Sequence, residues 1–220
     1  MKISFVLLQL ILGPIFLLGF VRSDPDPLQD YCVASAENPP NFYGNGVPCI
    51  NPDQAIASHF ATSALSTPGD TRNQFGFSTS LTNTNNLRGL NTLGLAMARL
   101  DIAPDALLPL HSHPRASEVT ILLKGSLFAG FVDASNHLFT RQLRPGDCFV
   151  FPKGLIHYLY NMDKEEAALA ISGFSSQNPG LQISSSAAFT SNPGIPDEVL
   201  EKTFKIHGPD VAKIRRSLGG

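Results

Sequence analysis

Tryptophan is absent from this 220-residue sequence, cysteine occurs only three times, and charged residues make up 15% of the chain. The 16 Lys and Arg residues are balanced by 18 Asp and Glu residues, and they form no basic patch interleaved with aromatic side chains. A nucleic-acid partner is therefore not expected. The sequence also lacks any Asn-X-Ser/Thr triplet, so N-glycosylation is not expected either.

Long apolar runs are scarce too, and the longest lies at the start of the chain. From Ile3 to Phe20 the only polar side chains are Ser4 and Gln9, and small Ser23 follows shortly afterwards. This pattern predicts a secretory signal peptide, residues 1–23. The alternative is an uncleaved membrane anchor, since the run approaches the ~20 residues that span a bilayer. Gly13-Pro14 interrupts the run, so we expect cleavage, export and no membrane contact of the mature protein.

The three cysteines agree with export. Cys32 and Cys49 enclose 16 residues rich in Pro, Gly and Asn, and such a loop in an oxidising compartment predicts a disulfide. The bridge would clip a turn-rich N-terminal arm, residues 24–50. Cys148 is left over and alternates with Phe149 in "CFVFP", so we expect it at a buried strand position. The alternative is an intermolecular bridge or a reactive thiol.

The remaining composition indicates many short strands joined by turns. Glycine (18) and proline (17) are plentiful, and hydrophobic residues make up 43% of the chain, which is enough for a core. From residue 93 to 175, short apolar or alternating runs are separated by turns such as "DASN" and "RPGD". This spacing predicts an all-β sandwich or barrel, and no crossover-helix pattern interrupts it. Residues 51–92 look irregular, with "FGFSTSL" as a short strand.

The C-terminal segment, residues 196–218, has helical periodicity instead. Its two apolar stripes are Val199, Leu200 and Phe204 in the first stretch, and Val211, Ile214 and Leu218 in the second. We expect two short helices. They either pack on their own barrel or clasp a neighbouring subunit.

The stretch "PLHSHPRASE" contains a candidate metal site. Side chains two apart share one face of a strand, so His111 and His113 point the same way. Glu118 would lie on the opposite face of a continuous strand, but Pro114 breaks the pairing and lets Glu118 open the next strand facing back. Imidazole nitrogens with one carboxylate oxygen suit Mn, Fe, Ni, Cu or Zn.

A second stretch, "GDCFVFPKGLIHYLYN", supplies another histidine. His157 follows the turn glycines and lies on a strand, where a buried unpaired imidazole would be costly. His59, His137 and His207 have no such setting and are interpreted as ordinary histidines.

The two stretches together resemble a known pair of motifs. The spacings H-x-H-x(4)-E-x(6)-G from His111 to Gly125 and G-x(5)-P-x-G-x(2)-H-x(3)-N from Gly146 to Asn161 are similar to the two boxes of the cupin superfamily. This variant, with "DPDPLQDYCVA" and "NTLGLAMARLDIAP", resembles plant germins and germin-like proteins. The resemblance covers residues 24–220 and implies a single germin-type cupin domain.

By this resemblance the fold is a cupin β-jelly-roll barrel with short C-terminal α-helices. The ligands of one Mn(2+) per chain, inside the barrel core 93–175, would be His111, His113, Glu118 and His157. The resemblance also implies the Cys32–Cys49 disulfide and secretion to the apoplast. It further implies a homohexamer, a trimer of dimers in which the tail helices clasp neighbours.

Three functions are compatible with that family: oxalate oxidase, superoxide dismutase, and a non-catalytic wall, defence or receptor protein. Oxalate-oxidising germins resemble one another in carrying asparagines where this chain has Ala98 and Leu108, and Leu110 replaces a proline. Losing such donors from a buried anion site costs on the order of 1–3 kcal/mol each. We therefore expect a pocket lined by Ala98, Leu108 and Leu110 that does not oxidise oxalate. Dismutation of superoxide, a small anion, needs only an accessible redox metal, so this function and the non-catalytic one stay open.

Overall fold

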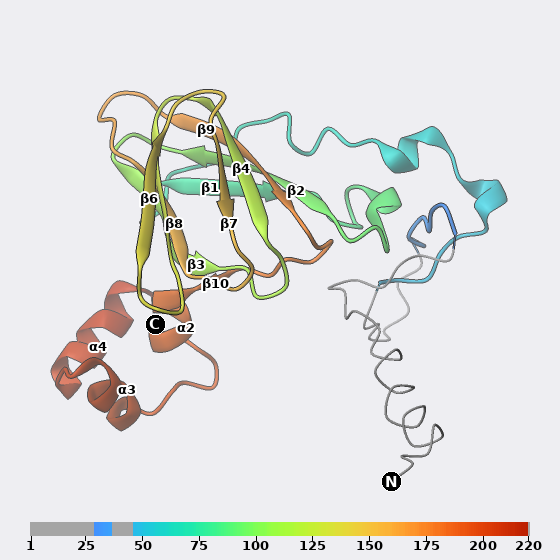
Figure 1. Cartoon of the computed structure of the whole chain (residues 1–220). Helices are drawn as coiled ribbons and strands as arrows, with labels where there is room; N and C mark the ends of the chain where they lie inside the picture. The colour runs from blue at the N-terminus through green and yellow to red at the C-terminus, as the bar shows by residue number, and fades with distance from the viewer. Residues whose placement is uncertain (1–28, 37–45, 220) are drawn as a thin grey trace, which may run out of the picture.

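The structure is a computed structural model that describes residues 29–36 and 46–219 (Figure 1). The predicted signal peptide, 1–23, lies outside these residues. Two antiparallel five-stranded sheets enclose the core, in the orders β1-β2-β9-β4-β7 and β10-β3-β8-β5-β6. The predicted all-β barrel with short C-terminal helices is confirmed.

The strands follow the expected runs closely. They are β1 (Phe77–Leu81), β2 (Ala96–Ile102), β3 (Ala106–Ser112), β4 (Glu118–Lys124), β5 (Leu127–Val132), β6 (Leu138–Leu143), β7 (Cys148–Phe151), β8 (His157–Asn161), β9 (Ala168–Phe174) and β10 (Gln182–Ile183). Short 3-10 helices lie at Pro52–Gln54, Ala57–Phe60 and Arg88–Leu90, in the segment that looks irregular from its sequence.

Alternation along each strand places the core between the sheets. On β2, Ala98 and Leu100 are buried, whereas Met97 is 45% exposed on the outer face. The same period of two holds on β8 and β9, whose inward side chains are fully buried. The inner faces of both sheets therefore form one continuous apolar core.

A β-bulge on β3 changes the face on which its side chains lie. Leu108 pairs with Leu159 of β8, but the next pair is His111 with His157, so β3 has one extra residue between them. Without the bulge, Leu110 would point inward and His111 outward. With it, His111 is buried and Leu110 is 49% exposed. Pro109 lies in the bulge, where its missing N–H breaks no ladder bond.

Three helices lie together beside one end of the barrel (Figure 1): α2 (Ser184–Phe189), α3 (Asp197–Phe204) and α4 (Gly208–Ser217). The sequence predicts α3 and α4 but not α2. Their shared cluster consists of Phe189, Leu200 and Val211, all buried, apart from the barrel core. Lys205, in the left-handed conformation at φ 57°, ends α3, and Gly208 begins α4.

The cysteines give one confirmation and one correction. Cys32 and Cys49 form the predicted disulfide. The prediction of a buried Cys148 is wrong, because Phe151 and partly buried Phe149 occupy the inward face of β7 and the thiol lies exposed on the outer face. Among the described residues, no helix is both long enough and apolar enough to cross a membrane.

Candidate metal centre

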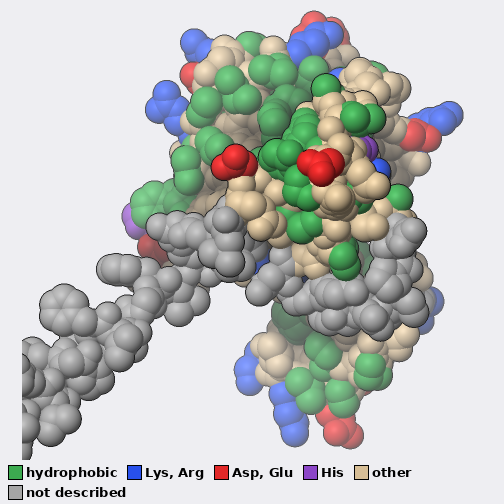
Figure 2. Space-filling model, turned by 90° about the vertical axis from the view of Figure 1, so that its right-hand side faces the viewer, with side chains coloured by type: hydrophobic (Ala, Val, Ile, Leu, Met, Phe, Trp, Pro, Cys, Tyr) green, Lys and Arg blue, Asp and Glu red, His purple; other side chains and the backbone are tan. Residues whose placement is uncertain are grey.

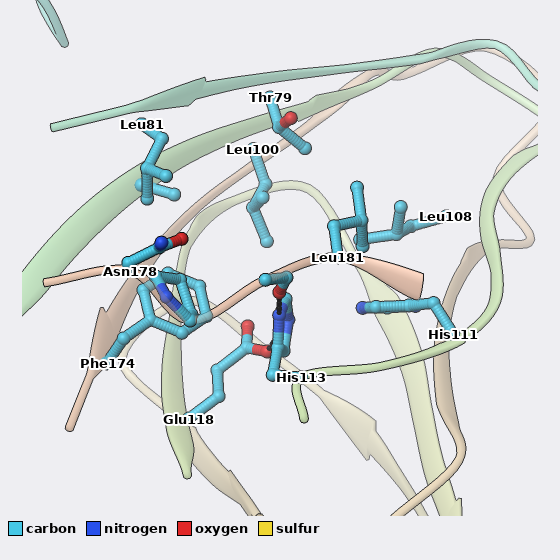
Figure 3. Close-up of a pocket in the computed structure, with 13 residues that line it drawn as sticks. Thr79, Leu81, Leu100, Leu108, His111, His113, Glu118, Phe174, Asn178 and Leu181 are labelled. Atoms are coloured by element: carbon cyan, nitrogen blue, oxygen red, sulfur yellow. Dashed lines mark hydrogen bonds and ion pairs between the residues drawn. The ribbon is translucent and has the colours of Figure 1, made fainter. Parts of the chain in front are cut away.

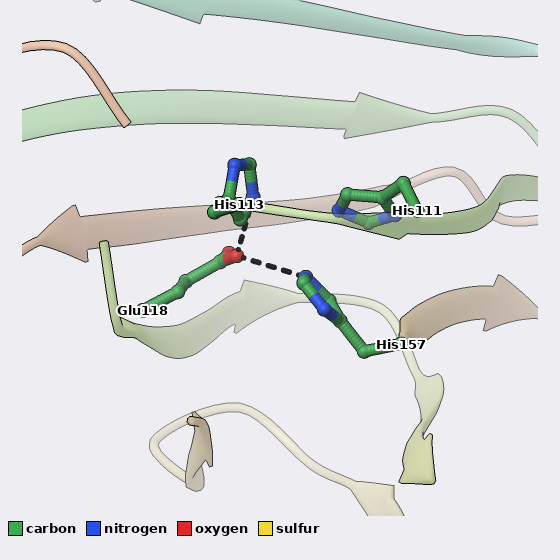
Figure 4. Close-up of side chains that lie close together, drawn as sticks. All are labelled: His111, His113, Glu118 and His157. Carbon is green, nitrogen blue, oxygen red and sulfur yellow. Dashed lines mark hydrogen bonds and ion pairs between the residues drawn. The ribbon is translucent and has the colours of Figure 1, made fainter. Parts of the chain in front are cut away.

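Four side chains converge between the two sheets (Figure 4). His111 and His157 are cross-strand partners on β3 and β8, and Glu118 is the first residue of β4 in the opposite sheet. His113 comes from the turn that joins β3 to β4. All four are buried, and one ligand atom of each lies within 4.8 Å of the others. The structure thus brings the four predicted ligands together.

Backbone carbonyls fix the orientation of the three imidazoles. Nδ1 of His111 lies 2.8 Å from the carbonyl oxygen of Pro109, and Nδ1 of His157 lies 2.8 Å from that of Leu155. Nδ1 of His113 contacts the carbonyl oxygen of Gly180. A carbonyl only accepts, so each Nδ1 carries the proton and each Nε2 keeps a lone pair. The three lone pairs are thereby available to a metal ion.

The carboxylate of Glu118 is held from both sides. Its Oε2 lies 2.9 Å from Nε2 of His113 and 3.2 Å from Nε2 of His157. Thr120, two residues along the same face of β4, donates its hydroxyl to Oε1 at 2.8 Å. Thr120 in turn contacts the hydroxyl of Ser172 on β9 at 2.8 Å. These buried hydroxyls leave Oε2 facing the histidines.

The charges of the site call for a cation. Burial, and then repulsion from His157, lowers the pKa of His111 to about 3, so this imidazole is neutral. Burial acts to raise the pKa of Glu118, but the imidazoles of His113 and His157 beside its carboxylate outweigh burial and hold that pKa well below its ordinary value. Within the described residues, no Lys or Arg pairs with this buried carboxylate. Burying such a charge without a counterion is costly.

One buried atom of the site has no protein partner. Nε2 of His111 has no hydrogen bond to any described residue, although buried polar atoms are nearly always paired. A metal ion at the centre of the four ligand atoms would satisfy this lone pair and neutralise Glu118. The residues therefore fit a transition-metal ion with three nitrogen ligands and one oxygen ligand.

A cavity of about 270 Å³ opens onto His111, His113 and Glu118 (Figure 3). The cavity walls are otherwise largely apolar, and their larger apolar part is formed by Leu81, Ala98, Leu100, Leu108, Phe174 and Leu181. Ala98 and Leu108 line the cavity, as the sequence predicts. The prediction for Leu110 is wrong, because the β3 bulge turns this side chain out of the cavity.

Sequence reasoning missed the hydroxyl pair and most of the cavity wall. Thr120 could be found from its spacing, since it lies two residues from Glu118 on the same strand face. Ser172, Phe174 and Leu181 approach the site only through the pairing of β9 and β10 with their neighbours, and no local pattern predicts that pairing. His59, His137 and His207 lie outside the site, as expected.

A sequence model of the cupin family matches residues 63–212. Germin-like protein subfamily 1 member 1 of Arabidopsis thaliana is 53% identical over 220 residues, which cover 98% of this chain and 100% of the relative. Germin-like protein 3-1 of Oryza sativa subsp. japonica is 50% identical over 204 residues, 90% of this chain and 91% of the relative.

This chain belongs to the germin-like proteins of the cupin family.

Solved structures agree with this assignment. A structure from a study of the mechanism of oxalate oxidase superposes on the germin-like chain with a TM-score of 0.84 at 36% identity, covering 88% of this chain and 97% of the other. An oxalate oxidase in complex with glycolate gives a TM-score of 0.83 at 35% identity, with the same coverage.

Gly180 offers a test of how the germin-like site orients His113. Its φ of +71° suits glycine, and a Cβ here would lie 3.0 Å from Arg115 and 3.3 Å from Pro114. Gly180→Ala should displace the carbonyl that holds Nδ1 of His113 and weaken metal binding by about 10- to 100-fold. Metal affinity measured by competition with a chelator checks this.

Gly146→Ala is the matched control for that substitution. Gly146 also has a positive φ, of +95°, but a Cβ there would meet nothing within 4 Å. It should cost stability through strain while leaving metal affinity unchanged. An equal loss of affinity in both variants would contradict the positioning role of the Gly180 carbonyl.

The lowered pKa of His111 predicts how the metal-free protein responds to acid. Between about pH 3 and the ordinary value near 6.5, the unfolded chain binds a proton at this residue and the folded chain does not. Folding stability should therefore fall as pH drops through this window, by up to about 1.4 kcal/mol per pH unit from this group. The lowered pKa of Glu118 acts in the same direction.

Thermal unfolding at a series of pH values checks this expectation. His111→Leu lacks the titrating group and should show a flatter pH dependence than the unmodified metal-free protein. An equal pH dependence of thermal stability in the two proteins would show that the pKa of His111 is not lowered in the folded state.

Proposed function

We propose that this germin-like chain is a secreted, manganese-binding protein of the plant extracellular matrix that dismutates superoxide and does not oxidise oxalate. The observation that carries the proposal is a buried three-histidine, one-glutamate site that opens onto a cavity walled mainly by leucines and alanine. The site supplies ligands for a redox-active metal. The walls supply few hydrogen-bond donors for a larger anion.

The donor set supports manganese. Three imidazole nitrogens and the Oε2 atom of Glu118 give four ligands with one negative charge, and a six-coordinate ion would keep two positions for outside ligands. A bound manganese ion would supply one-electron redox chemistry at those positions. The protein's part is to hold the imidazoles through their Nδ1 protons and the carboxylate through Thr120.

The cavity wall argues against oxalate. The solved relatives named for oxalate oxidase are 35–36% identical to this chain, and the family resemblance places amide donors at the positions of Ala98 and Leu108. Both residues are 3% exposed here and neither can donate a hydrogen bond. A dianion held beside them would leave its second carboxylate unpaired, which is unfavourable in a buried site. Superoxide is a diatomic anion without a carboxylate, so it leaves no such group unpaired.

Assays with manganese-loaded protein test this preference. We expect superoxide consumption above the metal-free control and no hydrogen peroxide from oxalate at mildly acidic pH. Ala98→Asn combined with Leu108→Asn should improve oxalate binding more than superoxide turnover, because it restores amides to the wall. Robust peroxide release from oxalate by the unmodified protein would contradict the argument. Superoxide consumption no faster than in the metal-free control would favour the non-catalytic wall or receptor alternative.

Secretion and assembly complete the proposal. The Cys32–Cys49 disulfide suits an oxidising compartment, which supports export directed by residues 1–23. The outer face of the first sheet presents half-exposed Met97, Val119 and Val150 around a groove of about 450 Å³. Figure 2 shows hydrophobic side chains gathered over the barrel on one face of the molecule. Such patches mark protein contacts, which supports an oligomer, and the family resemblance makes a homohexamer, a trimer of dimers, the form that we propose.

A further inference from the structure

The cavity beside the metal ligands has an apolar interior and a polar rim. Ala98, Leu100 and Leu108 are each 3% exposed, and Phe174 is 7% exposed. The polar side chains Thr79 and Asn178 are exposed, and Nη2 of Arg115 donates to Oδ1 of Asn178 at 2.9 Å. The polar contacts therefore lie at the solvent-exposed rim of the cavity. The buried walls favour binding of a ligand that places hydrocarbon against them.

The cavity is large for the small anions considered above. An apolar cavity of about 150 Å³ holds a benzene ring, and this one measures about 270 Å³. The small side chain of Ala98, between Leu81 on β1 and Ser172 on β9, contributes to this space. A diatomic anion on the metal would leave most of this volume unused.

The charge of the lining fixes which end of a ligand faces the metal. Among the described residues that line the cavity, none is Lys or Arg, and the one charged side chain is the carboxylate of Glu118. An anionic head group can therefore be neutralised only by the metal ion itself. A second charge elsewhere on the ligand would lie against leucines, where its desolvation is uncompensated. The lining thus favours a ligand with one anionic end and an apolar body.

We propose that this cavity binds monocarboxylates with a branched apolar body, with 2-oxo acids as the favoured class, the carboxylate end on the metal and the hydrocarbon against Leu100, Leu108 and Leu181. The inference rests on the proposed metal site but not on its redox activity. A 2-oxo acid presents a carboxylate oxygen and the neighbouring carbonyl oxygen, which match the two positions that the four protein ligands leave on a six-coordinate ion. Its side chain then extends into the apolar space.

Isothermal titration of the full-length manganese-loaded protein with two acids tests the proposal. Pyruvate and 4-methyl-2-oxopentanoate carry the same head group and charge, and they differ by three carbons in the body. Full burial of each added carbon improves affinity by about fourfold, or about 60-fold for three carbons, so partial burial should still make 4-methyl-2-oxopentanoate bind at least about tenfold more tightly. Equal affinities would overturn the proposal. So would equal binding of 4-methyl-2-oxopentanoate to the metal-free protein, because the head group would then not be on the metal.

Two matched variants locate the apolar contact. Leu181 lines the cavity and Leu138 on β6 lies outside it, and both side chains are 49% exposed. Leu181→Asn should weaken 4-methyl-2-oxopentanoate binding by about three- to tenfold and leave pyruvate within about twofold, whereas Leu138→Asn should change neither. Equal effects of the two substitutions would overturn the assignment of the cavity wall.

Metal analysis of the same samples separates this inference from the proposed function. Protein that holds no manganese would overturn both. Protein that holds manganese and consumes superoxide but does not distinguish the two acids would overturn only the inference about the cavity. Preferential binding of 4-methyl-2-oxopentanoate supports the inference whether or not superoxide is consumed.

Discussion

His113→Ala should remove most of the metal from this protein. His113 supplies one of four converging ligand atoms, and its Nε2 also contacts the carboxylate of Glu118 at 2.9 Å. Its loss leaves three ligands around an ion and frees the carboxylate to turn away. Elemental analysis should find about one manganese per chain in the unmodified protein and less than about a tenth of that in the variant, because ligand loss removes binding energy directly.

His137→Ala is the control, because His137 is exposed on the turn between β5 and β6 and takes no part in the ligand cluster. It should keep full occupancy. Native protein purified without any transition metal, or equal occupancy in the two variants, would contradict the assigned site. Release on acidification is expected as well, since protons compete with the metal for imidazole nitrogens.

Truncation after Pro193 should convert the proposed homohexamer into smaller oligomers. It removes α3 and α4, which pack against each other and form a small cluster with α2 separate from the barrel core. Val199 and Phe204 remain 50% and 47% exposed on α3. An apolar surface of this kind on a projecting helical unit is suited to contact a neighbouring subunit. Light scattering measures the mass of the particle.

A point substitution guards against misfolding of the truncated chain. Val199→Asp places a charge on the exposed side of α3, while Leu200, 2% exposed, keeps its place in the cluster. It should also reduce the oligomer, with unchanged far-ultraviolet circular dichroism. A hexamer that survives both changes would exclude a clasp by these helices and place the contacts elsewhere, for example on the outer face of the first sheet.

The sequence predicts the barrel because the strands and turns that its local patterns favour are the ones that the packed sheets contain. Runs of alternating apolar residues become strands, and turn sequences such as "DASN" and "RPGD" fall between them. Glu118 opens β4 facing the histidines, as the break at Pro114 requires. These features depend on residues only a few positions apart, so the sequence of a single strand or turn is enough to predict them.

Two predictions were wrong: the burial of Cys148, which was based on alternation, and the place of Leu110 in the cavity wall, which was based on the family resemblance. At Cys148 the alternation itself is correct, but it does not say which face is inward, and the bulkier Phe149 and Phe151 took that face. At Leu110 the bulge at Pro109 added a residue and reversed the faces of β3. In both cases the decision depends on the opposing strand, which a single sequence segment does not contain.

By itself, the sequence determined the identity of the four converging side chains and the barrel that carries them. Only the tertiary structure decided the arrangement of the metal centre and its cavity. Strand pairing put Ser172 beside Thr120, and the backbone of the β9–β10 connection brought the carbonyl of Gly180 to His113. The same connection supplied Leu181 to the cavity wall. The physical reason is that ligand spacing follows from local backbone geometry, whereas Gly180 and Ser172 lie tens of residues from His113 and Thr120 and meet them only when the sheets pack.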